Sequence, residues 1–319
     1  MSDLKLGILL WSQATDWPAF RDAAVRSDRL GYDHIWTWDH LYAIFGNPFQ
    51  PIFEGYTALA ALAALTTRAR LGLLVGANTF RNPGLVAKSI TTIDHISGGR
   101  AILGLGGAWM ELEHRAHGLD FGTGFGQRLD WLDESVGVIR RLLDGETVTH
   151  ESDRYRFDEL RQRPLPLQEH LPILIGGSGE KKTLRTVAKY ADMWNGMGSE
   201  EFLARKVRVL DDHCAAIGRD PGEIERTAGC KVTIRDTEAE ARRVLADLMA
   251  ANRTPLTDIA DDDTFWAGTP RQIADKMVAQ RELGFTTFIS EMPAPFDFES
   301  IERWIGEVKP MVEGASATA

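Results

Sequence analysis

The feature that most constrains the fold is a unit that recurs eight times along the chain: a short apolar run followed by an amphipathic helical segment. The apolar runs do not alternate with polar residues, which is typical of strands buried on both faces of a parallel sheet. Parallel strands joined by helices are therefore favoured. The expected strands are residues 5–11, 34–37, 70–76, 101–106, 172–176, 193–195, 227–234 and 285–290.

Eight such units without a break in composition predict an α/β fold, a single (β/α)₈ TIM barrel over residues 1–313. Because such a barrel needs about 250 residues, the chain has room for loop insertions. The alternative, a doubly wound sheet with a second domain, requires a glycine-rich turn after the first strand, and residues 11–14 contain no glycine. Insertions are expected at about 38–55, 107–127, 146–171 and 252–268, and a flexible tail at 314–319.

Composition limits the partners and the compartment. The net charge of −10 argues against a nucleic-acid partner, because binding to phosphate backbones requires clustered lysine and arginine. No apolar run approaches the roughly 18 residues of a membrane span, and the N-terminus lacks a signal pattern. Two cysteines are too few for a disulfide framework. We therefore expect a cytoplasmic protein that acts on a small molecule and does not bind membranes.

Active-site residues of such barrels lie directly after the strands, at the carboxyl-terminal rim. The residues there are polar and aromatic, as a planar ring ligand with polar edges would require. In chain order they are Trp38, Asp39 and His40, then Asn78, then Gly107, Ala108 and Trp109, then Gly177, Ser178 and Gly179, and finally Asn195 and Glu291.

His40 is the best single candidate for a catalytic residue. Histidine side chains serve as general acids and bases near neutral pH, although an isolated histidine is more often structural. The place of His40 after a strand, beside Trp38 and Asp39, favours catalysis. His114 has no second set of ligands near it in the sequence, so no metal site is expected.

Two glycine-rich segments each have two interpretations. Gly177-Ser178-Gly179, between a strand and a helix start, is either a phosphate cradle or a tight turn. The segment 104–107 is either a nucleotide loop or a place where the backbone approaches a ligand closely. Trp109 and Trp266 fall in predicted insertions, where each either forms a pocket wall or packs on its own loop.

At these residues the chain resembles the luciferase-like monooxygenase superfamily, and more closely its branch that uses the deazaflavin coenzyme F420. The resemblance covers nearly the whole chain, and the order and spacing of its motifs are specific. The motifs are Leu30-Gly31-Tyr32-Asp33, Trp38-Asp39-His40, Asn78 to Pro83, Asp94 to Arg100, Leu103 to Trp109 with Glu113-His114, Pro172 to Gly179, and Gly268-Thr269-Pro270.

The resemblance implies a bacterial luciferase-like barrel that forms a homodimer, with a non-proline cis peptide near Leu74 to Gly76. It also implies hydride transfer between coenzyme F420 and a small organic substrate, in which His40 handles the substrate proton. The residues implied to line the coenzyme are Asp39, Ala77, Asn78, Gly107, Ala108 and Glu113, with Gly177, Ser178 and Gly179 at its phosphate. The expected substrate pocket consists of Trp38, Trp109, Asn195 and Trp266.

One residue departs from the pattern of the relatives that oxidise a sugar phosphate. Those relatives carry a catalytic glutamate where this chain has Trp109, so the departure favours an apolar or aromatic substrate. Two other functions stay open. One is a monooxygenase that uses reduced FMN on the same barrel, because the two coenzymes share a ring shape and a ribityl phosphate. The other is a barrel that binds a flavin-like ligand without catalysis.

Overall fold

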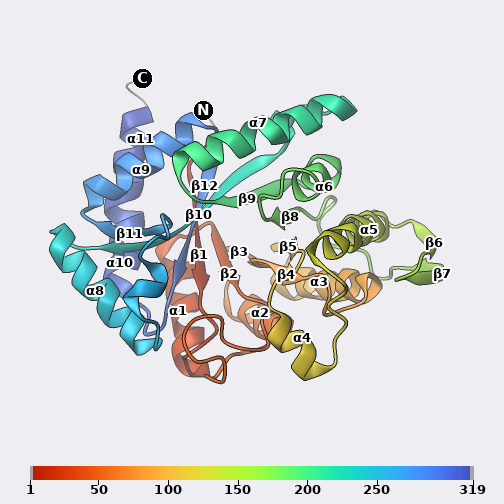
Figure 1. Cartoon of the computed structure of the whole chain (residues 1–319), viewed down its shortest axis with the longest axis horizontal. Coiled ribbons are helices and arrows are strands. Elements are labelled where there is room, and N and C mark those ends of the chain that lie inside the picture. Colours follow the sequence, from red (N-terminus) through yellow and green to blue (C-terminus); the bar gives the residue numbers. More distant parts are fainter. Residues whose placement is uncertain (1–2, 317–319) are drawn as a thin grey trace.

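The computed structural model describes residues 3–316, and its centre is a closed barrel of eight parallel strands (Figure 1). Going around the barrel, β12 is followed by β1, β2, β3, β5, β8, β9 and β10, and β10 pairs with β12. The strands are β1 (Lys5–Leu10), β2 (His34–Thr37), β3 (Arg70–Leu73), β5 (Ala101–Gly106), β8 (Ile173–Gly176), β9 (Met193–Met197), β10 (Glu225–Ile234) and β12 (Phe285–Met292).

Two pairings close the barrel and distinguish it from an open doubly wound sheet. Lys5 of β1 lies opposite Thr287 of β12, and Met193 of β9 lies opposite Glu225 of β10. Both pairings are parallel, as are all the others around the barrel. The predicted (β/α)₈ barrel is therefore confirmed.

Helices surround the strands, and their ends follow from local sequence. Asp16 caps α1 by accepting a hydrogen bond from the amide of Ala19 at 2.8 Å, and Gly31 ends that helix with a φ of 98°. The helices of the outer layer are α1 (Trp17–Leu30), α2 (Gly55–Leu65), α3 (Pro83–Ser97), α5 (Phe125–Leu143), α6 (Thr183–Tyr190), α7 (Glu200–Ile217), α8 (Glu238–Ala251), α9 (Pro270–Glu282), α10 (Phe298–Arg303) and α11 (Lys309–Ser316).

The third expected strand is split in two. β3 ends at Leu73, a short strand β4 (Gly76–Ala77) follows, and the Leu74–Val75 peptide between them is cis, where the resemblance implied it. Val75 projects between two neighbouring strands: a Cβ on Gly106 or on Gly176 would lie 2.6 or 2.8 Å from its methyl carbons. Glycines at these two positions therefore make room for Val75.

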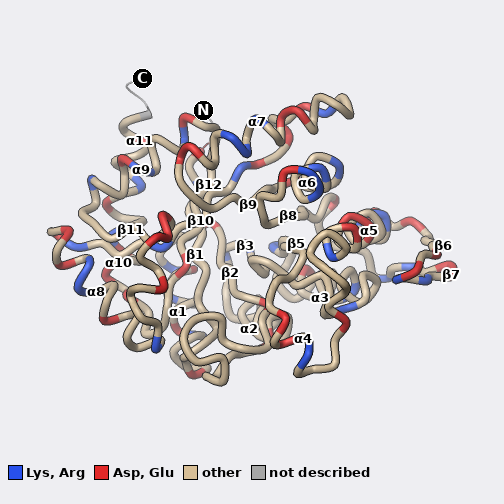
Figure 2. The backbone as a smooth tube through the Cα atoms, in the orientation of Figure 1, with Lys and Arg blue, Asp and Glu red and all other residues tan. Residues whose placement is uncertain are grey.

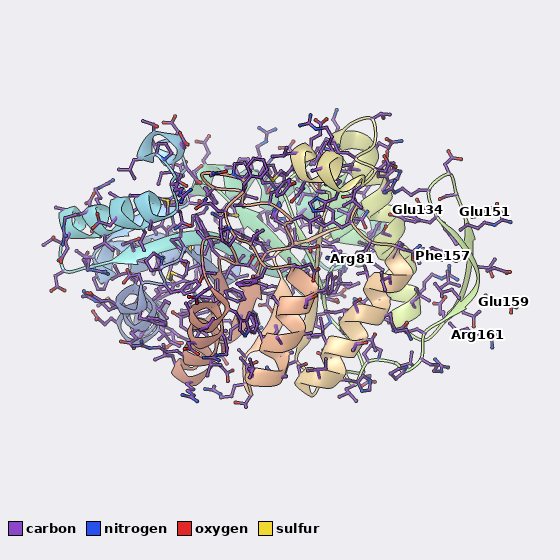
Figure 3. All side chains as sticks on the ribbon, turned by 90° about the horizontal axis from the view of Figure 1, so that it is seen from below. Arg81, Glu134, Glu151, Phe157, Glu159 and Arg161 are labelled. Atoms are coloured by element: carbon purple, nitrogen blue, oxygen red, sulfur yellow. The ribbon has the colours of Figure 1, made fainter. Side chains whose placement is uncertain are left out.

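The predicted insertions hold both loops and regular elements. Residues 107–127 contain a short helix, α4 (Glu111–His117). Residues 146–171 contain an antiparallel hairpin of β6 (Thr147–Glu151) and β7 (Arg156–Arg161), which stands at the edge of the molecule in Figure 3. Three short helical turns complete the structure: η1 (Pro221–Glu223), η2 (Leu256–Ile259) and the π-helical turn η3 (Trp304–Val308).

Two boundaries differ from the sequence prediction. Residues 265–268 are not loop but strand β11 (Phe265–Gly268), which extends the sheet by pairing with the end of β10. The sequence did not predict β11 because a strand of four residues outside the eight repeated units is too short to show a hydrophobic pattern. Helix α11 continues to Ser316, into the tail expected at 314–319, and residues 317–319 of that tail lie outside the described residues.

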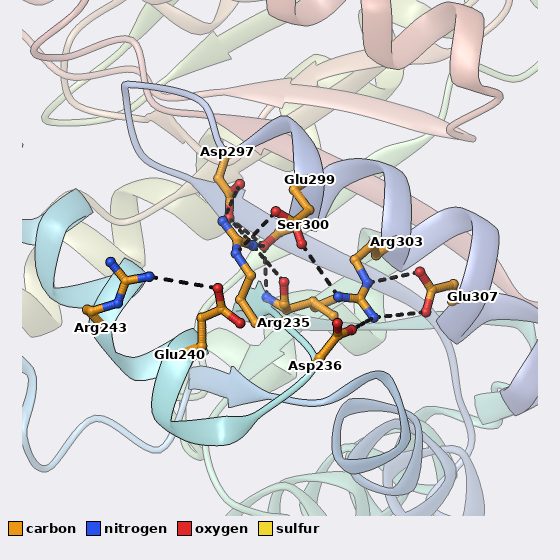
Figure 4. Close-up of polar contacts among 10 residues, drawn as sticks. Arg235, Asp236, Glu240, Arg243, Asp297, Glu299, Ser300, Arg303 and Glu307 are labelled. Atoms are coloured by element: carbon orange, nitrogen blue, oxygen red, sulfur yellow. Dashed lines mark hydrogen bonds and ion pairs between the residues drawn. The ribbon is translucent and has the colours of Figure 1, made fainter.

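Charged residues are found mainly along the outer helices and the hairpin (Figure 2). One exception holds the end of β10 to α10: the guanidinium of Arg235 donates to both oxygens of Asp297 at 3.1 and 3.0 Å (Figure 4). Within residues 3–316, no helix has the length and apolar character needed to cross a membrane.

Candidate active site

A cavity of about 340 Å³ opens at the carboxyl ends of the barrel strands. Its walls are mostly apolar, with a few polar groups contributed by different strands, which is the usual character of a small-molecule site. Of the residues predicted from the sequence, those that line it are Trp38, Asp39, His40, Ala77, Gly107, Ala108, Trp109, Glu113, Gly177, Asn195 and Glu291.

His40 and Glu113 form a hydrogen-bonded pair at this cavity. Nδ1 of His40 lies 3.0 Å from Oε1 and 3.2 Å from Oε2 of Glu113, and the Leu41 amide donates to Oε2 at 2.8 Å. A carboxylate can only accept hydrogen bonds, so Nδ1 carries the hydrogen and the other ring nitrogen, Nε2, is left without a partner among residues 3–316. The resemblance assigned Glu113 to the coenzyme, but in the structure both of its oxygens are engaged in holding His40 and the loop after β2.

Trp109 stands beside His40 where the cavity meets solvent. Their rings meet edge to face, with centroids 5.5 Å apart, and Trp109 remains 59% exposed. The preceding residue, Ala108, has a φ of 57°, in the left-handed region that non-glycine residues seldom adopt. The backbone turn at Ala108 thus brings the indole over the histidine.

Asp39 holds the irregular third strand. Its carboxylate accepts the Ala77 amide at 2.9 Å and both terminal nitrogens of Arg81, at 2.7 and 2.9 Å. Arg81 also pairs with Glu54 and lies over the Tyr56 ring. Burial lowers the pKa of the Arg81 guanidinium, but the charge and hydrogen bonds of Asp39, together with Tyr56 and Glu54, outweigh it and the pKa is raised overall. Asp39 is only 1% exposed, and its charge is therefore largely taken up by Arg81.

Trp38 belongs to an aromatic wall. Its ring lies 4.8 Å from that of Trp11, which in turn stacks on Phe45 at 4.4 Å. Buried Gln13, directly after β1, holds Phe45 in place by accepting its amide at 3.2 Å and donating to its carbonyl at 3.1 Å. The Trp11 and Phe45 rings are parallel within 7°, whereas the Trp38 ring is tilted by 35° from that of Trp11, and the wall is apolar.

The loop between β8 and α6 contains the predicted phosphate-binding residues. Gly177 lines the cavity and has a φ of 116°, whereas Ser178 and Gly179 lie further along the loop, outside the cavity lining. The N-cap residue of α6, Lys182, makes no capping hydrogen bond with its side chain. The second glycine-rich segment, 104–107, has a different explanation: a Cβ on Gly104 would overlap the carbonyl oxygen of Leu73 at 1.9 Å, so close packing within the barrel requires glycine there.

Three further predicted residues occupy different environments. Asn195 lines the cavity and donates to the Thr227 hydroxyl at 2.9 Å. Asn78 is buried just behind Ala77, outside the cavity lining, and its side-chain Nδ2 has no hydrogen-bond partner. The expectation that Trp266 belongs to the substrate pocket is wrong for this cavity. Trp266 is 3% exposed on β11, its indole N–H donates to the Asp263 carbonyl, and it does not line the cavity.

Sequence reasoning gave no role to Lys231, Glu291 or Arg81, although the first two line the cavity and the third fixes Asp39. Lys231 is the single charged residue of the expected strand 227–234, and this signal was available. The sequence placed Glu291 at the rim of the barrel but gave no indication of its function. The clue to Arg81 is its partner 42 residues earlier, which a single sequence does not reveal.

The sequence profile of the family described as "Luciferase-like monooxygenase" matches residues 6–287, most of the chain. The chain belongs to this family. The relatives named below include oxidoreductases, and the chain is an oxidoreductase of this family. Among residues 3–316, no group of three or more histidine, cysteine, aspartate and glutamate side chains is arranged to hold a metal ion.

Three relatives show how the chain compares with other members of the luciferase-like family. An uncharacterized protein of Mycobacterium tuberculosis is 33% identical over 172 residues, which cover 54% of this chain and 60% of that protein. The F420-dependent glucose-6-phosphate dehydrogenase of Kineococcus radiotolerans is 26% identical, with 97% of each chain covered. The structure of an F420-dependent secondary alcohol dehydrogenase in complex with an F420-acetone adduct superposes with a TM-score of 0.83 at 18% identity, over 98% of this chain and 99% of the other.

Proposed function

We propose that this luciferase-like protein is a coenzyme F420-dependent oxidoreductase that transfers a hydride between the deazaflavin ring and a small organic substrate. The observation that carries the proposal is the His40–Glu113 pair at the mouth of an apolar cavity. The names of the aligned relatives support the choice of coenzyme. Trp109, where relatives that oxidise sugar phosphates are expected to carry glutamate, argues against a sugar-phosphate substrate.

The residues present fit a flat ring with a phosphate tail. The Trp38 wall and the backbone at Ala77 and Gly107 offer apolar and peptide surfaces to a ring. The buried Nδ2 of Asn78 has no partner, so a donor is available immediately behind Ala77. The loop at Gly177 leads to a helix start without a side-chain cap, a place where backbone amides accommodate an anion. When bound, the coenzyme would supply the hydride or accept it.

The chain's own residues would then orient the substrate and move one proton. Glu113 fixes the tautomer and the orientation of His40, as the carboxylate does in a catalytic triad. Nε2 of His40 is therefore the atom that gives the proton to the substrate oxygen during reduction, or takes it during oxidation. Trp109 and the aromatic wall exclude water from the reacting atoms.

The experiment that tests this proposal is a pair of binding titrations of the purified protein, one with coenzyme F420 and one with FMN. We expect coenzyme F420 to bind at least tenfold more tightly, followed by absorbance changes of the coenzyme when substrates are screened. Tight binding of FMN without binding of coenzyme F420 would contradict the proposal and would favour the reduced-FMN monooxygenase. Binding of coenzyme F420 without turnover of any substrate would favour a non-catalytic binding protein.

A further inference from the structure

A second buried carboxyl group lines the cavity and has no part in the function proposed so far. Glu291 lies at the end of β12, opposite Leu9 of β1, and is 8% exposed. The indole N–H of Trp11 donates to its Oε2 at 3.2 Å. Its other oxygen, Oε1, has no hydrogen-bond partner among residues 3–316. Glu291 therefore presents one unused hydrogen-bonding atom at the cavity.

Burial in this place raises the pKa of Glu291 above its ordinary value. Lys231, the Trp11 hydrogen bond and His40 act in the opposite direction, whereas Asp262 acts in the same direction as burial. Lys231 lies on the neighbouring strand β10. Cys230 and Ser290 form the last residue pair that joins β10 to β12, and Lys231 and Glu291 are the residues that directly follow this pair on their two strands.

Lys231 does not form an ion pair with Glu291 because its ammonium group is engaged elsewhere. Nζ donates to the Thr264 hydroxyl at 2.8 Å, lies 3.6 Å from Asp262, and stands over the Phe265 ring at 4.6 Å. These contacts hold the lysine toward the loop before β11. A protonated Glu291, which donates a hydrogen bond of its own, is therefore consistent with the geometry.

The other charged groups of the cavity are also paired, which limits what a substrate can be. Asp39 binds Arg81, and Glu113 binds His40 and the Leu41 amide. An anionic substrate would find no unpaired cation among the described lining residues, and the walls are apolar. A neutral molecule with an oxygen acceptor meets two free polar atoms, on His40 and on Glu291.

We propose that Glu291 is a second substrate-contacting residue, whose carboxyl group donates a hydrogen bond to the oxygen of a neutral carbonyl compound. This inference rests on the proposed function and names its substrate class: carbonyl compounds with an apolar body, and the alcohols formed from them. In the reducing direction, the carbonyl carbon accepts the hydride with its electron pair, and the π electrons of the C=O bond move to oxygen. That oxygen takes the proton from His40, the coenzyme is oxidised by two electrons, and Glu291 keeps its own proton throughout.

The test compares two probes of similar shape, cyclohexanone and cyclohexanecarboxylate, whose binding is followed by ligand-observed NMR at pH 7 and pH 9. At pH 7 the ketone should bind the wild-type protein at least tenfold more tightly than the carboxylate. Ketone binding itself should weaken between pH 7 and pH 9, because ionisation of Glu291 removes the donor and an ionised carboxylate repels the carbonyl oxygen.

Variants at Glu291 make the assignment specific. Glu291→Leu removes the donor and should weaken ketone binding about tenfold, the effect of one hydrogen bond to a buried acceptor. Glu291→Gln keeps a donor that does not ionise, so it should bind the ketone like the wild type at pH 7 and keep that binding at pH 9. Exposed Glu169 provides the control, and Glu169→Gln should change nothing. Circular dichroism confirms that each variant is folded, and the Gln variant remains informative if the Leu variant is not.

The outcomes separate this inference from the proposed function. Equal or tighter binding of the carboxylate, binding of neither probe, or unchanged ketone binding in Glu291→Leu would overturn the assignment of Glu291. Failure of coenzyme F420 to bind would overturn the proposed function, and the probe experiment on the coenzyme-free protein would still report on Glu291.

Discussion

Glu113 and Glu291 are two buried carboxyl groups at one cavity, and they are partnered differently. Both oxygens of Glu113 accept hydrogen bonds from His40, and the Leu41 amide adds another to Oε2. Glu291 accepts one hydrogen bond, from Trp11, and its pKa is raised by burial. We therefore infer two roles for the same residue type: Glu113 orients a base, and Glu291 keeps its own proton. Hydrogen-bond partners, more than residue type or burial, separate the two roles.

The largest effect should come from removing the base that Glu113 orients. His40→Ala should lower kcat by about 10²- to 10⁴-fold, the usual contribution of a positioned acid or base. Coenzyme affinity should stay within about twofold, and steady-state rates with a parallel binding titration measure both quantities. His95, an exposed histidine whose Nε2 lies near the Leu165 carbonyl, gives the matched control His95→Ala. An unchanged kcat in His40→Ala would remove His40 from the mechanism.

Glu113→Gln should lower kcat by about 10²-fold, less than the loss of His40 itself, because the imidazole remains but its orientation is no longer fixed. Since Glu113 acts through His40, the KM of the substrate should change little while kcat falls. Glu111, exposed in the same turn of α4, supplies the control Glu111→Gln. A rise in KM at constant kcat would instead assign Glu113 to ligand binding, as the family resemblance first implied.

Asp39 is the third carboxyl group of the cavity, and its charge is engaged by Arg81. Asp39→Asn leaves that guanidinium with Glu54 as its remaining ion-pair partner, and should lower the free energy of unfolding by about 2 kcal/mol. Urea unfolding measures the change. Asp22→Asn, at an exposed pair with the neighbouring Arg21, should have almost no effect. Equal stability of the two variants would show that Asp39 is not held as the structure describes.

A further effect concerns the pH dependence of stability. Since the pKa of Glu291 is raised in the folded state, the native protein binds more protons than the unfolded chain between the ordinary glutamate pKa of 4.5 and the raised value. Wild-type stability should therefore fall, relative to Glu291→Gln, as pH rises through this window. Each pH unit of the window contributes at most about 1.4 kcal/mol. Thermal unfolding of both proteins at pH 5 and pH 8 measures the difference, and a constant difference would contradict the raised pKa.

The sequence predicted the barrel and the cluster after β2 because both depend on local pattern. Apolar runs without alternation identify parallel strands, and the ends of parallel strands meet at one rim, so Trp38, Asp39 and His40 could be placed together in advance. The resemblance also located the cis peptide before Val75.

The roles of the polar residues were harder to predict because they depend on partners distant in the sequence. Glu113 is 73 residues from His40, and the contacts of Glu291 come from β1 and β10. Trp266 was misplaced because β11 is an extension of the sheet that the count of eight units does not contain. Hydrophobic patterns in the sequence locate the strands. The chemistry of the polar side chains depends on which side chains of other strands and loops they contact.

We propose that the two glutamates act differently because Glu291 keeps its proton. Isotope-edited infrared difference spectroscopy of the protein labelled at glutamate carboxyl carbons tests this difference directly. We expect a protonated carboxyl band near neutral pH that disappears in Glu291→Gln and persists in Glu113→Gln. Absence of such a band in the wild type, or its survival in Glu291→Gln, would contradict it.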